Sequence, residues 1–358
     1  YQDLYVCPVT EKDPGQILFS SMGRVGPIAL MSDLNADFYI VKEESNKETR
    51  IYQKVIPHIA PYLHLLKTET LDKIPGQEFK SPGSPYPNGK YAVSCYTIDW
   101  GQYDIVISIN ISLPTQLILK YPQTLFAYMI GEANMATGKA RFGYDATLNQ
   151  MARGRISHKC GAIDFPYTFV AKDTLEKIMQ QYLGRPSARK GIFMEINSTT
   201  ERPVTRIPDH FQPLADAGYE IILHQQKIAD NLKNIYDAKY FVKMGGRSIR
   251  GNSVAEAVSL GTLAIMNRDE VIHHELIIDE CNVKTMDEMI SLINRLENDP
   301  ELYRTLQQKQ RQVLHTYFFD APLQSLINCL KEKRGLSKPR TYSRWNRLFD
   351  NLYFLKLR

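Results

Sequence analysis

The stretch KYFVKMGGRSIRGNSVAEAVSLGTLAIM, residues 239–266, decides the predicted fold because it contains a strand, a glycine-rich loop, a helix and a second strand in succession. Residues 240–242 are strand-forming. Gly245, Gly246 and Gly251 allow backbone angles and close approaches that side chains prevent. A loop of this kind between a strand and a helix is typical of nucleotide-binding sites.

The start of the helix in this stretch is a predicted phosphate site. Asn252 or Ser253 is expected to cap the helix. The first turn of a helix presents free backbone N–H groups and the positive end of the helix dipole, so an anionic phosphate is favoured there. Three cations lie close to this point in the sequence: Lys243, Arg247 and Arg250.

The size of the chain favours two domains. Its 358 residues, of which 43% are hydrophobic, exceed the usual size of one domain, so we expect two cores with a cleft between them. Five widely spaced cysteines without a C-x-x-C pair argue against a disulfide framework or a structural zinc site, and they favour a reducing, cytoplasmic compartment. No apolar run approaches the roughly 18 residues of a membrane span. The sequence starts at Tyr1 rather than at methionine, which leaves a preceding segment open.

Residues 331–358 form a basic tail. The whole chain has a formal charge of +5, but this segment alone holds nine Lys or Arg residues against Glu332 and Asp350. Its cations alternate with aromatic residues, a composition that suits an anionic membrane surface. A solvated or self-packed terminal helix is the alternative. We do not expect nucleic acid as a partner, because the rest of the chain carries no comparable basic stripe.

The second half of the chain alternates strands with helices, which favours right-handed crossovers and a parallel, Rossmann-like sheet. Strands are expected at residues 191–196, 219–223, 240–242 and 262–266, with helices near 209–217, 228–236 and from 252. Ligands of such sheets bind at the carboxyl ends of the strands. Arg202, in the loop after the first of these strands, is a candidate phosphate ligand, with a surface salt bridge to Glu201 as the alternative.

Three helices are predicted to follow this sheet. Thr285 and Glu288 form a capping-box pattern, and Asp299 before Pro300 places a cap and then a proline at a helix start. Asp320 is predicted to start the third helix in the same way. We expect all three helices to be structural.

The first half contains apolar strands that suggest a sheet covered on both faces. The expected strands are residues 16–20, 38–41, 91–98, 104–110 and 124–130. Residues 131–161 have the polar and small side chains of a cleft lining, and three of them are candidate catalytic bases: Glu132, which follows the last of these strands, His158 and Asp145. Residues 184–190 are predicted to be a hinge between the domains.

The run GNSVAEAVSLGTLAI, residues 251–265, resembles the donor-binding element of GT-B glycosyltransferases, in which a glycine-rich turn opens a helix that carries a glutamate. The order of elements over residues 190–332 is similar to the second domain of that family. The resemblance implies an α/β fold of two Rossmann-like domains that face a cleft, followed by C-terminal helices and a basic tail. It divides the chain into an acceptor-side domain at 1–170, a donor-binding domain at 171–332 and the tail at 333–358.

Carried over by position, the resemblance implies donor contacts around the helix start. It places Ser253 and the neighbouring amides on the donor phosphates and Glu256 on the ribose hydroxyls. A first-turn glutamate that only interacts with the helix dipole is the alternative for Glu256. Ser248 stands where many retaining members have a second glutamate, so retention or inversion stays open. The expected donor-binding residues are Arg202, Lys243, Arg247, Arg250, Gly251, Asn252, Ser253 and Glu256.

The resemblance implies a glycosyltransferase that moves a sugar from a nucleotide-activated donor to a glycan or glycolipid acceptor, as in the synthesis of a surface polysaccharide at the cytoplasmic face of a membrane. No Asp-x-Asp pair is present and no cofactor is expected, so the predicted reaction is independent of metal ions. Adjacent side chains such as His273 and His274 diverge on a helix, which argues against a metal site there. A sugar-nucleotide epimerase with the same fold and a non-catalytic binding subunit are the alternatives.

Overall fold

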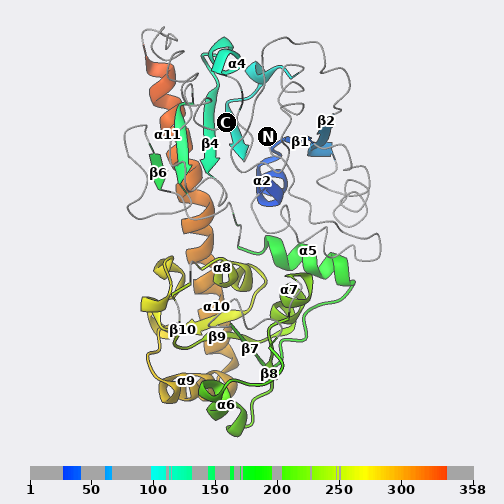
Figure 1. The fold of residues 1–358 in the computed structure, drawn as a ribbon, viewed down its shortest axis with the longest axis vertical. Helices are drawn as coiled ribbons and strands as arrows, with labels where there is room; N and C mark the ends of the chain where they lie inside the picture. The colour runs from blue at the N-terminus through cyan, green and yellow to red at the C-terminus, as the bar shows by residue number, and fades with distance from the viewer. Residues whose placement is uncertain are drawn as a thin grey trace, which may run out of the picture.

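The fold is α/β and its strands pair in parallel. Among the residues that it describes, a computed structural model contains one pair of strands and two runs of four paired strands (Figure 1). The neighbouring strands of the described part pair in parallel, which the alternation of strands and helices predicts for the second half of the chain. The structure describes residues 27–41, 61–66, 98–109, 113, 115–130, 144–149, 162–164, 170, 172–195, 204–225, 228–246, 248–249 and 251–336.

The first four-stranded sheet belongs to the first half of the chain and has the order β3-β4-β5-β6. Its strands are β3 (Ile105–Ile109), β4 (Leu125–Ile130), β5 (Ala146–Asn149) and β6 (Ala162–Asp164). In the same half of the chain, β1 (Phe38–Val41) pairs in parallel with β2 (Leu63–Leu66). The strands predicted at 38–41, 104–110 and 124–130 are therefore confirmed. The strand predicted at 16–20 lies outside the described residues, as does the one at 91–98 apart from Ile98.

Both faces of this first sheet are covered, because alternate residues of each strand point to opposite faces. Phe126 and Tyr128 of β4 pack on one face with Leu117 of α4 (Thr115–Lys120). Leu125 and Ala127 pack on the other face, in a cluster that also contains residues of α2 (Pro27–Leu34) and α11 (Ala321–Gly335). Strands that are buried on both faces account for the nearly unbroken apolar runs in the sequence.

The second four-stranded sheet has the order β10-β9-β7-β8. Ile192 pairs with Tyr240 on one side and with Ile221 on the other, and Leu263 pairs with Tyr240. All four strands coincide with strands predicted from the alternating pattern. They are β7 (Ile192–Met194), β8 (Ile221–Ile222), β9 (Tyr240–Lys243) and β10 (Leu263–Met266).

Helices cover both faces of the second sheet. Phe193 and Phe241 pack against α5 (Thr174–Leu183), α7 (Ile228–Asp237) and α8 (Asn252–Ser259). Ile192 and Val242 pack on the opposite face with the short segments η8 (Asp209–Phe211) and α6 (Gln212–Asp216), and with α9 (Met286–Asn298) and α10 (Pro300–His315). Burial of each such large apolar side chain contributes about 1.5–3 kcal/mol. Figure 1 shows α2 and α5 between the two four-stranded sheets.

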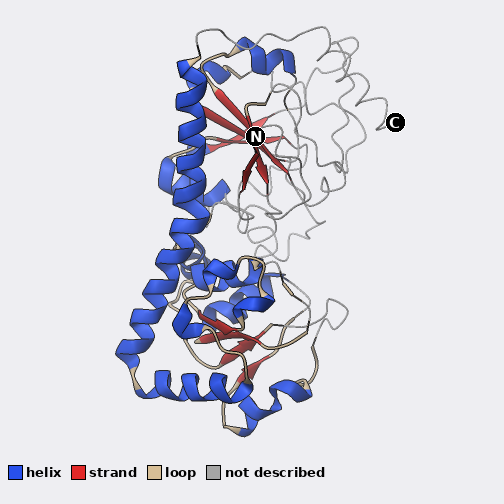
Figure 2. Ribbon diagram, turned by 90° about the vertical axis from the view of Figure 1, so that its left-hand side faces the viewer, coloured by secondary structure: helices blue, strands red, loops and turns tan. Residues whose placement is uncertain are grey.

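The predicted N-caps of two terminal helices are confirmed, and the N-cap predicted for the third helix is wrong. Thr285 and Glu288 form a complete capping box at α9. Asp299 accepts hydrogen bonds from the first amides of α10. Asp320 has helical backbone angles and makes no capping bond, because it lies inside a π-helical segment, η12 (Thr316–Asp320), that joins α10 directly to α11. A residue with helical angles cannot act as an N-cap, so α10, η12 and α11 form one continuous helix, which runs along one side of the molecule (Figure 2).

The carboxyl end of α11 is fixed to the first sheet by charged side chains. Lys333 Nζ lies 2.8 Å from Asp145 Oδ2 and 2.6 Å from the carbonyl oxygen of Thr124. Arg334 Nη2 lies 2.6 Å from Asp104 Oδ1. Two cations of the predicted basic tail therefore contact the protein itself, and residues 337–358 lie outside the described part.

The described helices include none that combines the length and the apolar character needed to cross a bilayer.

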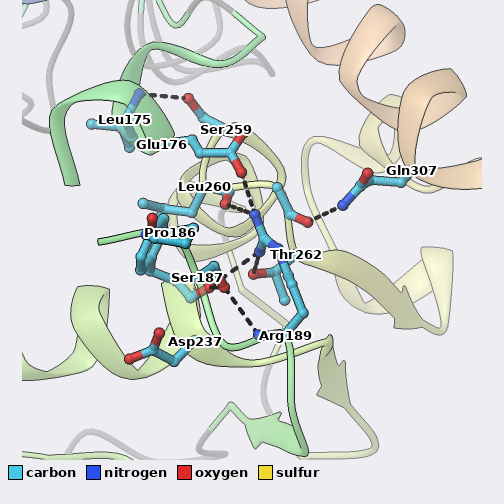
Figure 3. Close-up of polar contacts among 12 residues, drawn as sticks. Leu175, Glu176, Pro186, Ser187, Arg189, Asp237, Ser259, Leu260, Thr262 and Gln307 are labelled. Carbon is cyan, nitrogen blue, oxygen red and sulfur yellow. Dashed lines mark hydrogen bonds and ion pairs between the residues drawn. The ribbon is translucent and has the colours of Figure 1, made fainter. Parts of the chain in front are cut away.

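Residues 184–190, which were predicted to be a hinge, are bound to their surroundings instead. Arg185 makes two hydrogen bonds to Asp237, of 2.7 and 2.6 Å. Arg189 Nη2 lies 2.5 Å from Glu176 Oε1 and 2.7 Å from the carbonyl oxygen of Leu260, at the end of α8 (Figure 3). These bonds connect α5, α7 and α8, which makes the segment a brace within the second half.

Glu176, Arg189, Leu260, Thr262 and Arg311 form what we call the carboxyl-end network of α8. Arg189 Nη1 lies 3.2 Å from Thr262 Oγ1, and Arg311 pairs with the second carboxylate oxygen of Glu176. Gly261 lies under both guanidinium groups with a φ of 83°, and a Cβ atom at this position would overlap them. Glycine is required at 261 both for this angle and for this close approach.

Candidate functional site

The candidate site lies at the carboxyl ends of β9 and β10, the edge at which parallel sheets bind ligands. Residues 244–251, here called the glycine loop, connect β9 to α8. Gly251 is the N-cap of α8 with a φ of 112°. A Cβ atom on Gly251 would lie 3.1 Å from Val271 and 3.3 Å from His273, so a side chain would strain both the backbone and this contact.

The cap of α8 differs from the sequence-based expectation. Asn252 and Ser253 were the predicted caps, but α8 begins at Asn252, and Gly251, which has no side chain, takes the cap position. The amides of the first turn of a helix have no partners within the helix. Because Gly251 contributes no oxygen acceptor from a side chain, these amides are not used by a capping side chain. They are the groups that an anion at this end would accept hydrogen bonds from.

Lys243, the last residue of β9, is buried and contacts the glycine loop. Its side chain is fully buried, and its Nζ atom lies 2.6 Å from Glu270 Oε2 and 2.6 Å from the carbonyl oxygen of Gly245. The ammonium group thus neutralises Glu270 and binds the loop backbone. A phosphate contact by Lys243 stays a prediction, whereas its contact with the loop is part of the structure.

Glu270 is a residue of this site to which the sequence analysis gave no role. Its Oε1 atom accepts a hydrogen bond from the Gly245 amide at 3.0 Å. Its carbonyl oxygen accepts from the Ile249 amide at 2.9 Å and from the Ser248 hydroxyl at 3.1 Å. The available signal was its place in the loop after β10, at the same sheet edge as the glycine loop. Ser248 therefore helps to hold this loop.

Glu256 lies among the buried residues of α8. All residues from 254 to 259 are buried, and Glu256 is 9% exposed. Its contact with a ribose stays a prediction.

Asn252 supplies an unsatisfied acceptor at the helix start. Its Oδ1 atom is buried and has no hydrogen-bond partner among the described residues. A buried polar atom without a partner costs about 1–3 kcal/mol. Ser253 beside it is partly exposed. A ligand that donates a hydrogen bond to Asn252 would remove this cost.

Of the remaining candidate residues, the structure describes only Asp145. Asp145 lies just before β5, at the amino end of the first sheet, where Oδ2 accepts from the Phe126 amide at 2.8 Å and binds Lys333. This position serves the attachment of α11, and the role of Asp145 as a base stays a prediction. Five other candidates lie outside the described residues: Glu132, His158, Arg202, Arg247 and Arg250.

Metal and thiol chemistry find no support in the described part of the chain. No group of three or more His, Cys, Asp or Glu side chains there could hold a metal ion. His273 makes edge-on ring contacts with Tyr317 and Phe318. Cys281 is fully buried, and this burial raises the pKa of its thiol to about 12, so the group is protonated near neutral pH and is a poor nucleophile.

Comparison with known proteins finds structural similarity without sequence similarity. No protein-family model matches the chain, and no curated protein sequence matches it. Among solved structures, T4 phage beta-glucosyltransferase is 12% identical at a TM-score of 0.39, with 84% of this chain and 98% of that chain covered. Sucrose-phosphate synthase from Thermosynechococcus elongatus is 13% identical at a TM-score of 0.38, with 93% and 97% covered. The pneumococcal O-GlcNAc transferase GtfA, solved with UDP and GlcNAc, is 10% identical at a TM-score of 0.36, with 68% and 59% covered. The chain is thus similar, at low identity, to glycosyltransferases.

Proposed function

We propose that this protein is a GT-B glycosyltransferase that binds a nucleotide-activated sugar at the amino end of α8 and transfers the sugar to a glycan or glycolipid acceptor. One observation carries the proposal. A glycine loop at the carboxyl edge of a parallel sheet leads into a helix whose cap residue, Gly251, leaves the first-turn amides to a ligand. These amides suit the diphosphate of a nucleotide sugar, because they stabilise the negative charge that grows on it as the glycosidic bond breaks.

The proposed roles follow the arrangement around α8. The amides of Asn252 and Ser253 bind the diphosphate, Glu256 binds the ribose, and Arg202, Arg247 and Arg250 supply positive charge to the leaving group. A base in the first half takes the proton of the acceptor hydroxyl. Glu132 is preferred for this step because it follows β4 by two residues, at the carboxyl end of that strand in the sequence.

The wider setting is also part of the proposal. The donor-binding domain comprises residues 171–332 and faces an acceptor-side domain at 1–170 across a cleft. The product is a surface polysaccharide or glycoconjugate made at the cytoplasmic side of a membrane, which the tail at 333–358 contacts. The reaction needs neither metal ion nor cofactor, since side chains and helix amides supply the positive charge.

A donor screen tests the proposal. Thermal stabilisation and calorimetry with UDP-glucose, UDP-N-acetylglucosamine and GDP-mannose should identify one donor that binds. UDP-glucose comes first because it is the substrate named for the phage enzyme. Release of free nucleotide only when an acceptor glycan is added supports a transferase. Conversion of the sugar without an acceptor indicates an epimerase instead, and binding of none of these donors favours a non-catalytic subunit.

The same assay, repeated with EDTA and with Mn2+, tests whether the reaction is independent of metal ions. A structure of the phage enzyme contains UDP and Mn2+. Activity of the present protein should persist in EDTA and should not increase with added Mn2+. Loss of activity in EDTA that Mn2+ restores would contradict metal independence while leaving glycosyl transfer in place.

A further inference from the structure

Lys243 and Glu270 form an ion pair at the base of the glycine loop. The Lys243 side chain is 0% exposed and that of Glu270 is 18% exposed. One carboxylate oxygen of Glu270 accepts from Lys243 and the other from the Gly245 amide, while Lys243 also donates to the Gly245 carbonyl oxygen. The pair therefore binds both the amide and the carbonyl group of one loop residue.

Glu270 extends from a segment that is itself fixed. It ends the short helix η9 (Arg268–Glu270), which Asn267 caps through a hydrogen bond from the Asp269 amide. The Arg268 guanidinium donates twice to the carbonyl oxygen of Ile277, at 2.9 and 2.6 Å. The Glu270 carboxylate thus holds the glycine loop from a rigid platform, which is what a preorganised site requires.

Stability alone does not account for a buried ion pair at this position. The cost of removing two charges from water is often larger than their attraction, so an apolar pair of similar size folds as well or better. The pair lies at the candidate ligand edge, and the Glu270 carbonyl oxygen also binds the loop at Ile249 and Ser248. Together these contacts hold the loop at Gly245, Ser248 and Ile249.

We infer that Glu270, paired with Lys243, is a positioning residue that orders the glycine loop for the diphosphate of the donor before the donor binds. This inference rests on the proposed function. The Gly245 amide donates to the carboxylate at position 270, and the bond from Lys243 to the other oxygen of that carboxylate holds it in place. Preorganisation of this kind raises affinity because the loop loses less freedom on binding.

Two double variants test the role of the hydrogen-bond acceptor at position 270. Lys243→Met with Glu270→Gln and Lys243→Met with Glu270→Met both lack the buried charges, and only the first keeps an amide group at position 270, whose oxygen can accept from the Gly245 amide. We expect UDP, or GDP if the screen selects a GDP-sugar, to bind the Gln form about tenfold more tightly than the Met form in calorimetry. Hydrogen exchange without ligand should be faster for the Gly245 and Ile249 amides in the Met form.

A third variant provides the control. Glu297→Gln removes the ion pair between Glu297 and Lys239, whose atoms lie 2.9 Å apart at the amino end of β9, and it should leave the nucleotide Kd unchanged. Equal Kd values and equal exchange in the two double variants, at equal melting temperatures, would overturn the inference and leave the proposed function standing. If the wild-type protein binds no nucleotide sugar, the proposed function fails, and this inference fails with it.

Discussion

At its carboxyl end α8 is held by guanidinium groups, whereas at its amino end it meets a loop of backbone groups and one buried ion pair. Arg189 and Arg311 fill the space around Gly261, Arg189 donates to the carbonyl oxygen of Leu260 at the C-cap, and Arg311 pairs with Glu176. Gly251 leaves the opposite end without a capping side chain. Cations at the carboxyl end complement the helix dipole. The difference separates, within eight residues, an end that is occupied by side chains from the end at which we propose that the donor binds.

The largest expected effect comes from filling the space at the carboxyl end. Gly261→Ala should lower the free energy of unfolding by about 3 kcal/mol, because it combines strain at positive φ with overlap against two guanidinium groups. Urea denaturation measures this change. Gly218→Ala is the matched control: its φ is 90°, but no atom lies within 4 Å of the added Cβ. It should cost about 1 kcal/mol from backbone strain alone. Equal losses for the two variants would show that the carboxyl-end network adapts to the added atom.

An intermediate effect is expected at the amino end, on binding rather than folding. Glu256→Ala should weaken UDP binding about tenfold through loss of charged hydrogen bonds to the ribose. Calorimetry with UDP and 2′,3′-dideoxy-UDP provides the specific readout, since the variant should no longer distinguish the two nucleotides. Glu256→Gln keeps the size and one acceptor oxygen, and its loss should be smaller. A variant that still discriminates between the nucleotides as the wild type does would exclude the ribose contact.

The smallest effect is a dependence on pH at the brace that supports the carboxyl end. Burial raises the pKa of Asp237, but hydrogen bonds from Arg185 and from the Ala188 amide outweigh burial, so the pKa lies below its ordinary value. The stabilisation from this carboxylate is therefore complete above the unfolded-state pKa, and it is lost as pH falls through the lower folded-state pKa. Between about pH 6 and about pH 3, the wild-type protein should lose more stability than Asp237→Asn. The free energy of unfolding, measured by denaturation at each pH, provides the test. An equal loss of stability with falling pH in both proteins would contradict this prediction.

The sequence predicts elements better than it predicts the contacts between them. The strands and helix of residues 239–266 and the Thr285 cap follow from local patterns, which the structure confirms. Asp320 was misassigned because a polar residue before a proline has the same local appearance at a cap and inside a π-helical segment. Glu270 was missed because its partners at 243 and 245 are distant in sequence. Such pairings depend on which strands become neighbours, and hydropathy carries no information about side-chain hydrogen bonds across a sheet edge.

The attachment of α11 to the first sheet has a consequence for the order of folding on the ribosome. Leu326 and Leu330 belong to the apolar cluster that covers Leu125 and Ala127 of β4. While the chain is being synthesised, β4 emerges early, but one of its covering layers emerges only after the whole second sheet has been made. Domains usually fold in the order of their synthesis. The first sheet departs from this order, because it gains its last covering layer only when α11 has been made, after all the strands of the second sheet.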